Sequence, residues 1–247
     1  MIICGLCLGI VLGILKGLNV NSPNIKATLH LLTYVVMMLL QIRYALKKSK
    51  KQQSAFRIDF NKIQLWIVPV LIIGTLALVV GLERIATIIP MPVSVQKLFE
   101  KMFSRDVFSI ITMVIAAPIL EEILCRGIVL KGLLKNYQPY KAILISAIFF
   151  GAIHMNPWQA LPAFCGGLFL GWVYYRTQSV IPGMIIHATV NATAAVFLFL
   201  PNHKQDFLSL LGMPYYIILC VLSVITFSAV CLIIHRKTET TLGSSEI

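Results

Sequence analysis

The sequence predicts an all-α fold: a polytopic membrane bundle of about eight transmembrane helices, in which the fifth helix is short or broken. Of the 247 residues, 58% are hydrophobic and only 12% are charged, and the mean hydropathy is +0.87. A soluble globular domain carries about twice that share of charged residues. The apolar residues are gathered in runs separated by short basic segments, a pattern typical of an integral, multi-pass membrane protein.

Eight apolar runs account for the predicted helices. They cover residues 2–18, 27–46, 63–82, 107–130, 142–154, 160–175, 180–200 and 214–235. A hydrocarbon core of about 30 Å requires roughly 20 residues at 1.5 Å per residue. The run 142–154 is too short for this and is followed by Asn156-Pro157. Either the next loop dips into the protein, or the helix continues past a kink.

These runs divide the chain into three parts. Residues 1–106 hold the N-terminal membrane helices and an amphipathic segment from Val95 to Phe103, which we expect to lie in the membrane interface. Residues 107–200 hold the polar motifs described below, and residues 201–247 form the last membrane helix and a polar tail. The first apolar run lacks a basic segment and a cleavage site, so we expect it to be retained.

The basic residues predict an orientation with both termini in the cytoplasm. That topology places about two thirds of the 21 Lys and Arg residues, led by the cluster 47–51, on the inner side of the membrane. The net charge of +12 therefore reflects topology. Nucleic acid is not an expected partner, because the basic residues are not interleaved with aromatic residues as a single-strand binding surface requires.

Small residues and cysteines give weaker indications. Glycines recur at every fourth position from Gly5 to Gly17, and again at Gly167 and Gly171, a spacing that allows close helix packing within the bundle or at a dimer contact. The oligomeric state stays open. All six cysteines lie in or beside apolar runs, so a secreted disulfide framework is not expected, and Cys4-Gly-Leu-Cys7 lacks the βαβ context of a redox site.

The most informative residues are the polar ones inside the apolar runs. Glu121, Glu122 and Arg126 lie within 107–130, where each charge costs a few kcal/mol unless it faces protein or water. Two histidines and an asparagine follow in later runs: His154, His187 and Asn191. Each has a plain structural interpretation. The histidines could be packing residues, Asn191 could join two helices, and Glu122 with Arg126 could be an intrahelical ion pair.

Depth in the membrane favours a shared site. Counted inward from the nearest inner basic residue, Glu121, His154 and His187 lie about 15, 20 and 16 Å deep. Three polar side chains on three helices therefore reach one level, which predicts a single polar pocket open to the cytoplasm. Because adjacent helical residues point about 100° apart, we expect Glu121 to face this pocket while Glu122 pairs with Arg126. A carboxylate placed in this way suits a general base.

Three motifs in this order resemble the CPBP family, the intramembrane proteases that include the CAAX prenyl endopeptidases and bacterial Abi-type proteins. The motifs are Glu-Glu-x-x-x-Arg at 121–126, Phe-x-x-x-His at 150–154 and His-x-x-x-Asn at 187–191. The resemblance covers about 107–200 and implies that this part is the catalytic core of an intramembrane endopeptidase.

The resemblance also implies roles for individual residues. Glu121 and His154 would activate a water molecule, and His187 and Asn191 would hydrogen-bond the developing oxyanion. Glu122, Arg126 and Phe150 would support the site. Members of the family have been described both as metal-dependent and as glutamate-dependent enzymes.

The cofactor prediction therefore stays open between no cofactor and one divalent metal. Glu121, His154 and His187 could bind Zn²⁺ with one position left for water, although the His-Glu-x-x-His pattern of soluble zinc proteases is absent. The expected partners are membrane lipids and a peptide or protein substrate, with or without a lipid modification.

By analogy, the compact size suggests a bacterial cell membrane and a part in bacteriocin maturation or immunity. Two alternative functions use the same pocket. One is a proton-coupled transporter, although the chain shows no internal repeat of the kind many transporters have. The other is a catalytically silent protein that binds a peptide.

Overall fold

A computed structural model describes residues 13, 23–52, 56–95, 105–201 and 206–238. These residues form helices joined by short connections, and the only β pairing within the described ranges is an isolated bridge between Phe60 and Ser179. The predicted all-α class is therefore confirmed. The helices are α2 (Pro23–Gln52), α3 (Ile67–Ala86), α5 to α7 (Val107–Leu133), α8 (Pro139–Ala152), α9 (Pro157–Thr177), α10 (Ile181–Phe199), α11 (Phe207–Leu211) and α12 (Met213–Lys237).

The segment Val107–Leu133 is one continuous helix, here named the motif helix, in which π-helical and α-helical turns alternate. It consists of α5 (Val107–Ile111), a π-helical turn η1 (Thr112–Ala116), α6 (Ala117–Glu122), a second π-helical segment η2 (Ile123–Leu130) and α7 (Lys131–Leu133). Such turns widen the helix and move the side chains that follow around its axis.

Five of the described helices are long and apolar enough to cross a membrane. They are Ile25–Lys51, Ile67–Ala86, Val107–Leu133, Ile181–Phe199 and Met213–Lys237. Seven of the eight predicted runs coincide with helices, and the first, 2–18, lies outside the described residues except for Gly13. The chain is thus an integral, multi-pass membrane protein, and a count of eight spans stays a prediction. Most of the predicted interfacial segment and the end of the polar tail also lie outside the described residues.

The short fifth run forms the helix α8, after which the chain turns and begins a new helix, α9. α8 stops at Ala152, Met155 adopts a left-handed φ of 59°, and Asn156 starts α9 by accepting a hydrogen bond from the backbone of Gln159 at 2.8 Å. Of the two predicted possibilities, continuation past a kink is wrong, because a capped new helix begins at Pro157.

Glycines allow α8 and α9 to pack closely. A Cβ atom on Gly167 would lie 3.2 Å from the Cα atom of Ala147, and one on Gly171 would lie 3.1 Å from a methyl carbon of Ile143. The prediction that these two glycines permit close helix packing is confirmed. Among the described residues, Gly13 has no neighbour within 4 Å of such an atom, and the other glycines of the first run lie outside the described residues.

The connection between α2 and α3 lies across the ends of three helices. Its residues 56–61, here named the strap, bond to the turn between α9 and α10: the backbone N–H of Val180 donates to the carbonyl of Asp59 at 3.0 Å, and Ser179 Oγ donates to the carbonyl of Asn61 at 2.8 Å. On the motif helix, Lys131 Nζ forms an ion pair with Asp59 Oδ1 at 2.6 Å.

The strap brings basic residues from distant parts of the sequence to one end of the bundle. Arg57 lies in the strap, Lys131 donates to its carbonyl at 2.7 Å, and Arg176 near the end of α9 bonds to the carbonyl of Thr238 after α12. This shared end agrees with the grouping of inner basic residues in the sequence, although which side of the membrane it faces stays a prediction.

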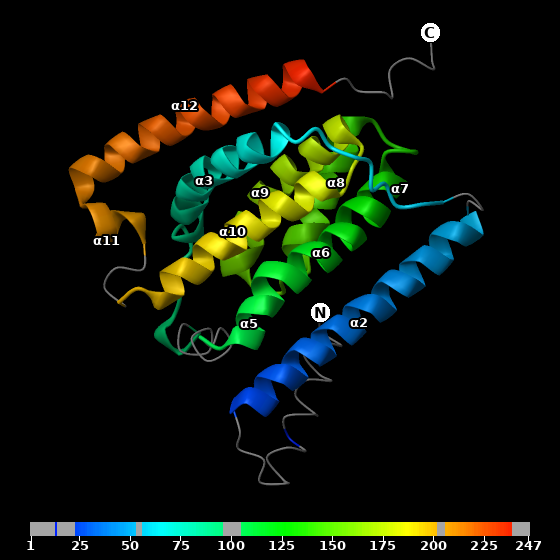
Figure 1. The fold of residues 1–247 in the computed structure, drawn as a ribbon, viewed down its shortest axis with the longest axis horizontal. Helices are drawn as coiled ribbons and strands as arrows, with labels where there is room; N and C mark the ends of the chain where they lie inside the picture. Colours follow the sequence, from blue (N-terminus) through cyan, green and yellow to red (C-terminus); the bar gives the residue numbers. More distant parts are fainter. Residues whose placement is uncertain (1–12, 14–22, 53–55, 96–104, 202–205, 239–247) are drawn as a thin grey trace.

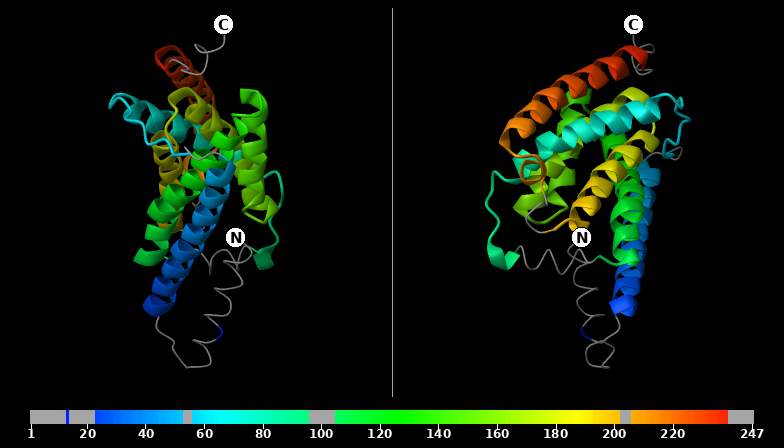
Figure 2. Two further views of the ribbon diagram at one scale, coloured as in Figure 1. Left: turned by 90° about the vertical axis from the view of Figure 1, so that its right-hand side faces the viewer. Right: turned by 60° about the vertical axis from the view of Figure 1, so that its left-hand side comes forward.

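The helices lie side by side with α2 and α12 at opposite edges (Figure 1). α2 lies along the motif helix in both views of Figure 2, and Tyr34, Met38 and Ile42 are its buried residues on the shared core. α12 packs on α3 at the other edge and exposes Ile217, Ile218, Val221 and Leu222, each by 55%. Apolar side chains exposed along a long helix fit a lipid-facing surface.

Candidate active site

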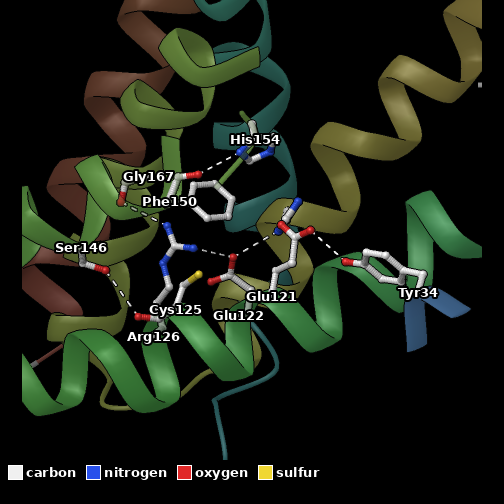
Figure 3. A network of polar contacts seen from close by, with 10 residues as sticks. Tyr34, Glu121, Glu122, Cys125, Arg126, Ser146, Phe150, His154 and Gly167 are labelled. Atoms are coloured by element: carbon white, nitrogen blue, oxygen red, sulfur yellow. Dashed lines mark hydrogen bonds and ion pairs between the residues drawn. The ribbon is translucent and has the colours of Figure 1, made fainter. Parts of the chain in front are cut away.

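Glu122 and Arg126 form a fully buried ion pair on the motif helix. Arg126 Nη1 donates to Glu122 Oε1 at 2.8 Å, and both side chains are 0% exposed. The guanidinium also donates from Nη2 to the carbonyl of Gly167 at 3.3 Å and lies 4.3 Å above the ring of Phe150. The predicted pairing is confirmed, and Arg126 joins the motif helix to α8 and α9 (Figure 3).

His187 on α10 reaches the same carboxylate from another helix. Its Nδ1 atom lies 3.1 Å from Glu122 Oε1. Because an ionised carboxylate only accepts hydrogen bonds, Nδ1 carries the hydrogen. A neutral imidazole then has its lone pair on Nε2, whereas an imidazolium can also donate from Nε2.

Gly183 makes this approach possible. A Cβ atom at that position would lie 2.6 Å from Glu122 Oε2, closer than a side chain can come. The absence of a side chain at Gly183 therefore lets α10 pass directly over the buried carboxylate, one turn before His187.

His154 lies in the turn directly after α8, and its tautomer is also set by a neighbour. Its Nδ1 atom is 2.8 Å from the carbonyl oxygen of Phe150. Since a carbonyl can only accept, Nδ1 carries the hydrogen and Nε2 is left as the basic atom of the neutral ring. The side chain is partly exposed, so Nε2 can meet a water molecule or a substrate.

Phe150 lies between the two histidines. Its ring makes edge contacts with His154, at a centroid distance of 5.3 Å, and with His187, at 5.5 Å. The predicted meeting of residues from separate helices is thus confirmed for His154 and His187, and Glu122 and Arg126 lie beside them. The approach of Glu121, the third predicted member, to the two imidazoles stays a prediction.

Asn191 lies one turn after His187 and bonds to a backbone group of the motif helix. Its Nδ2 atom donates to the carbonyl of Met113 at 2.8 Å. In the π-helical turn the backbone N–H of Ala117 bonds to Thr112, and Pro118 has no N–H to offer, so the carbonyl of Met113 needs another donor. Asn191 supplies it and keeps a second Nδ2 hydrogen for a further partner.

Glu121 is 6% exposed and accepts a hydrogen bond from a residue that the sequence did not single out. The hydroxyl of Tyr34 on α2 donates to Glu121 Oε1 at 2.8 Å (Figure 3). The available signal was a tyrosine inside the apolar run 27–46, since a buried hydroxyl needs a hydrogen-bond partner. The two adjacent glutamates therefore have different neighbours: Glu121 bonds to α2, and Glu122 bonds to Arg126 and α10.

The side chains that could hold a metal ion are not gathered as a ligand set. Among the described residues, no three His, Cys, Asp or Glu side chains lie close enough together to hold one. Glu121 bonds to Tyr34, and His187 bonds to Glu122 through Nδ1, which leaves its Nε2 outside that bond. Glu121, His154 and His187 are therefore not gathered as a ligand set in this arrangement. The metal requirement stays a prediction, and no step below passes through a metal.

One comparison finds a family model that matches this part of the chain. Residues 103–193 match the family model described as type II CAAX prenyl endopeptidase Rce1-like. No curated protein and no solved structure matches the chain. The matched region contains Glu121, Glu122, Arg126, Phe150, His154, His187 and Asn191. The resemblance to the CPBP family is thereby confirmed over residues 103–193 of an integral membrane protein, and this family indicates a protease of the CAAX type.

Proposed function

We propose that this protein is an intramembrane endopeptidase that hydrolyses a peptide bond with a water molecule activated by Glu121 and His154. The observation that carries the proposal is the different use of two adjacent buried carboxylates. Glu122 is bound by Arg126 and His187, whereas Glu121 beside it bonds to Tyr34 and forms no ion pair with any described residue. The first supports the site, and the second is available for chemistry.

The reaction begins with proton transfer. Glu121 removes a proton from water while the water oxygen bonds to the scissile carbonyl carbon, and the π electrons move to the carbonyl oxygen. His154 accepts a hydrogen bond from the water through Nε2, the atom left basic by its bond to Phe150. The protonated Glu121 then delivers the proton to the amide nitrogen as the carbon–nitrogen bond breaks.

His187 and Asn191 stabilise the oxyanion that forms in between. His187 can donate from Nε2 as an imidazolium, and Glu122 lies at the other end of the ring to balance that charge. Asn191 offers its second Nδ2 hydrogen, since the first is used on Met113. One such donor changes kcat by about 10²- to 10³-fold in well-studied enzymes.

The substrate is a peptide or protein segment that reaches the site from the cytoplasmic side or from the lipid. A C-terminal C-a-a-X tail with a lipid modification is one candidate, as the family description suggests. An unmodified bacterial peptide, as in bacteriocin maturation or immunity, is another. With either substrate, we propose that the protein lies in a cell membrane with both termini in the cytoplasm, as the basic residues predict.

The test is cleavage of a peptide library by the purified protein in nanodiscs. The library contains each sequence with and without a C-terminal prenyl group, so one experiment identifies both the sequence and the lipid requirement. Glu121→Gln and His187→Ala should each lower kcat by about 10²-fold or more. Glu83→Gln is the matched control, because it makes the same chemical change on α3, outside the site.

The outcomes separate the candidate functions. Parental turnover in Glu121→Gln would remove Glu121 as the base. If the parent and all variants fold but cut no peptide, while the parent binds one, the silent peptide-binding function is favoured over the protease.

A further inference from the structure

The hydroxyl of Tyr34 donates a hydrogen bond to Glu121, and Tyr34 lies in the part of the chain outside the family match. Tyr34 lies on α2, is 8% exposed and donates to Glu121 Oε1 at 2.8 Å. The match begins at residue 103. The family motifs therefore do not account for this contact.

The position of Tyr34 on α2 explains why its hydroxyl points to the motif helix. Tyr34, Met38 and Ile42 recur every four residues and form the buried stripe of α2. Leu32, Val36, Leu39 and Leu40 on the other sides are each exposed by 50% or more. A tyrosine on the buried stripe cannot turn its hydroxyl to water without leaving the core, so the hydroxyl needs an acceptor inside the core, and the carboxylate of Glu121 is one.

We propose that Tyr34 is a positioning residue that holds the carboxylate of Glu121 in the orientation needed to accept the proton of water. This inference rests on the proposed function of Glu121 as the base. A glutamate side chain has three rotatable bonds, and its terminal bond rotates over a broad range. The hydroxyl of Tyr34 fixes one oxygen, Oε1, and so fixes the plane of the carboxylate.

The same bond selects the oxygen that reacts. While Oε1 accepts the hydrogen of Tyr34, Oε2 is the better site for the incoming proton, because it does not share its electron density with a donor. After the transfer Oε1 is the carbonyl oxygen of a carboxylic acid and still accepts from Tyr34. The hydroxyl therefore stays in place throughout the reaction and neither gains nor loses a proton.

The first measurement is steady-state kinetics on Tyr34→Phe, which removes only the hydroxyl. A hydrogen bond to a charged group changes a rate by about ten- to a hundredfold. We expect kcat to fall by that factor, with KM unchanged within about threefold. Tyr44→Phe is the matched control, since Tyr44 lies on the same helix and is 70% exposed. It should retain parental kcat, KM and melting temperature.

The second measurement does not depend on turnover. The infrared carboxylate band of Glu121 is identified as the band that disappears in Glu121→Gln, which is practicable because the chain has only 9 acidic residues. Loss of a hydrogen bond to Oε1 should shift this band in Tyr34→Phe and leave it unchanged in Tyr44→Phe.

These two readouts distinguish the failure of this inference from the failure of the proposed function. A band shift with a lower kcat supports both. A band shift in a protein that cuts no peptide supports the hydrogen bond from Tyr34 to Glu121 and contradicts the proposed protease function. An unshifted band, or parental kcat in Tyr34→Phe, overturns the inference and leaves the protease standing. A lower melting temperature with parental kcat per active molecule would show that Tyr34 serves packing alone.

Discussion

The Nδ1 atom of His187 lies 3.1 Å from Oε1 of Glu122, so a hydrogen bond between buried side chains joins α10 to the motif helix. The same oxygen accepts from Arg126. One carboxylate thus balances a permanent charge and orients an imidazole. In an apolar surrounding this arrangement avoids an isolated charge, which would cost several kcal/mol.

Removal of this carboxylate should destabilise the fold. In Glu122→Gln the buried guanidinium of Arg126 loses its counter-ion, and we expect a loss of about 3–5 kcal/mol of unfolding free energy. Thermal unfolding in detergent, followed by tryptophan fluorescence, measures the change. The paired variant Glu122→Gln/Arg126→Met removes both charges and should recover most of the loss. A paired variant as unstable as the single one would show that the ion pair is not the cause.

Part of this site could be predicted from sequence spacing. Glu122 and Arg126 are four residues apart, and so are His187 and Asn191, so helical geometry alone places each pair on one face. Both expectations agree with the structure, in which His187 and Asn191 each bond to the motif helix. Local periodicity is sufficient for such contacts, because both residues share one rigid helix.

Contacts between helices could not be predicted in this way. The bonds from Tyr34 to Glu121 and from His187 to Glu122 depend on how three helices pack, which apolar runs do not specify. The π-helical turns of the motif helix could not be predicted either. In a run that is apolar on all sides, a shift of the side chains around the helix axis leaves the hydrophobic pattern unchanged. The fifth predicted run ends at residue 154, two residues beyond the end of α8 at Ala152, because the apolar pattern does not mark where the helix stops.

Asn191 and Pro118 should be coupled in stability. In Asn191→Leu the carbonyl of Met113 loses its donor, and we expect a loss of about 0.6–1.7 kcal/mol. Pro118→Ala allows an ordinary α-helical turn in which Ala117 bonds to Met113, so the same Asn191→Leu change should cost less in that background. A double-mutant cycle on melting temperature measures the coupling. Additive effects would contradict the proposed link through Met113.

Gly183→Ala should disturb the site without touching a catalytic side chain. The added methyl group would lie 2.6 Å from Glu122 Oε2, and Arg126 and His187 restrict the retreat of that carboxylate. We expect a loss of about 1–3 kcal/mol in stability and a lower kcat. Gly81→Ala is the control, since nothing lies within 4 Å of its Cβ position. Equal melting temperatures for the two variants would show that α10 can shift to accommodate the methyl group.

The strap should loosen when Gly127 is replaced. A Cβ atom at Gly127 would lie 2.8 Å from a methyl carbon of Ile58, so Gly127→Ala pushes the strap away from the motif helix. Trypsin should then cleave after Arg57 faster than in the parent, as followed by mass spectrometry. Gly132→Ala lies on the same helix with open space around it and should keep the parental rate. Equal protection in both variants would mean that Ile58 repacks without moving the strap.

Removal of metal should leave the activity unchanged. Among the described residues no three potential ligands are gathered closely enough to hold a metal ion. A zinc site needs at least three such side chains with one open position. We therefore expect parental kcat after treatment with 1,10-phenanthroline and less than one zinc per chain by elemental analysis. Zinc bound at one per chain, lost in His187→Ala and in His154→Ala together with the activity, would instead establish a metal-dependent reaction. The non-chelating isomer 1,7-phenanthroline controls for effects of the aromatic reagent on the membrane protein itself.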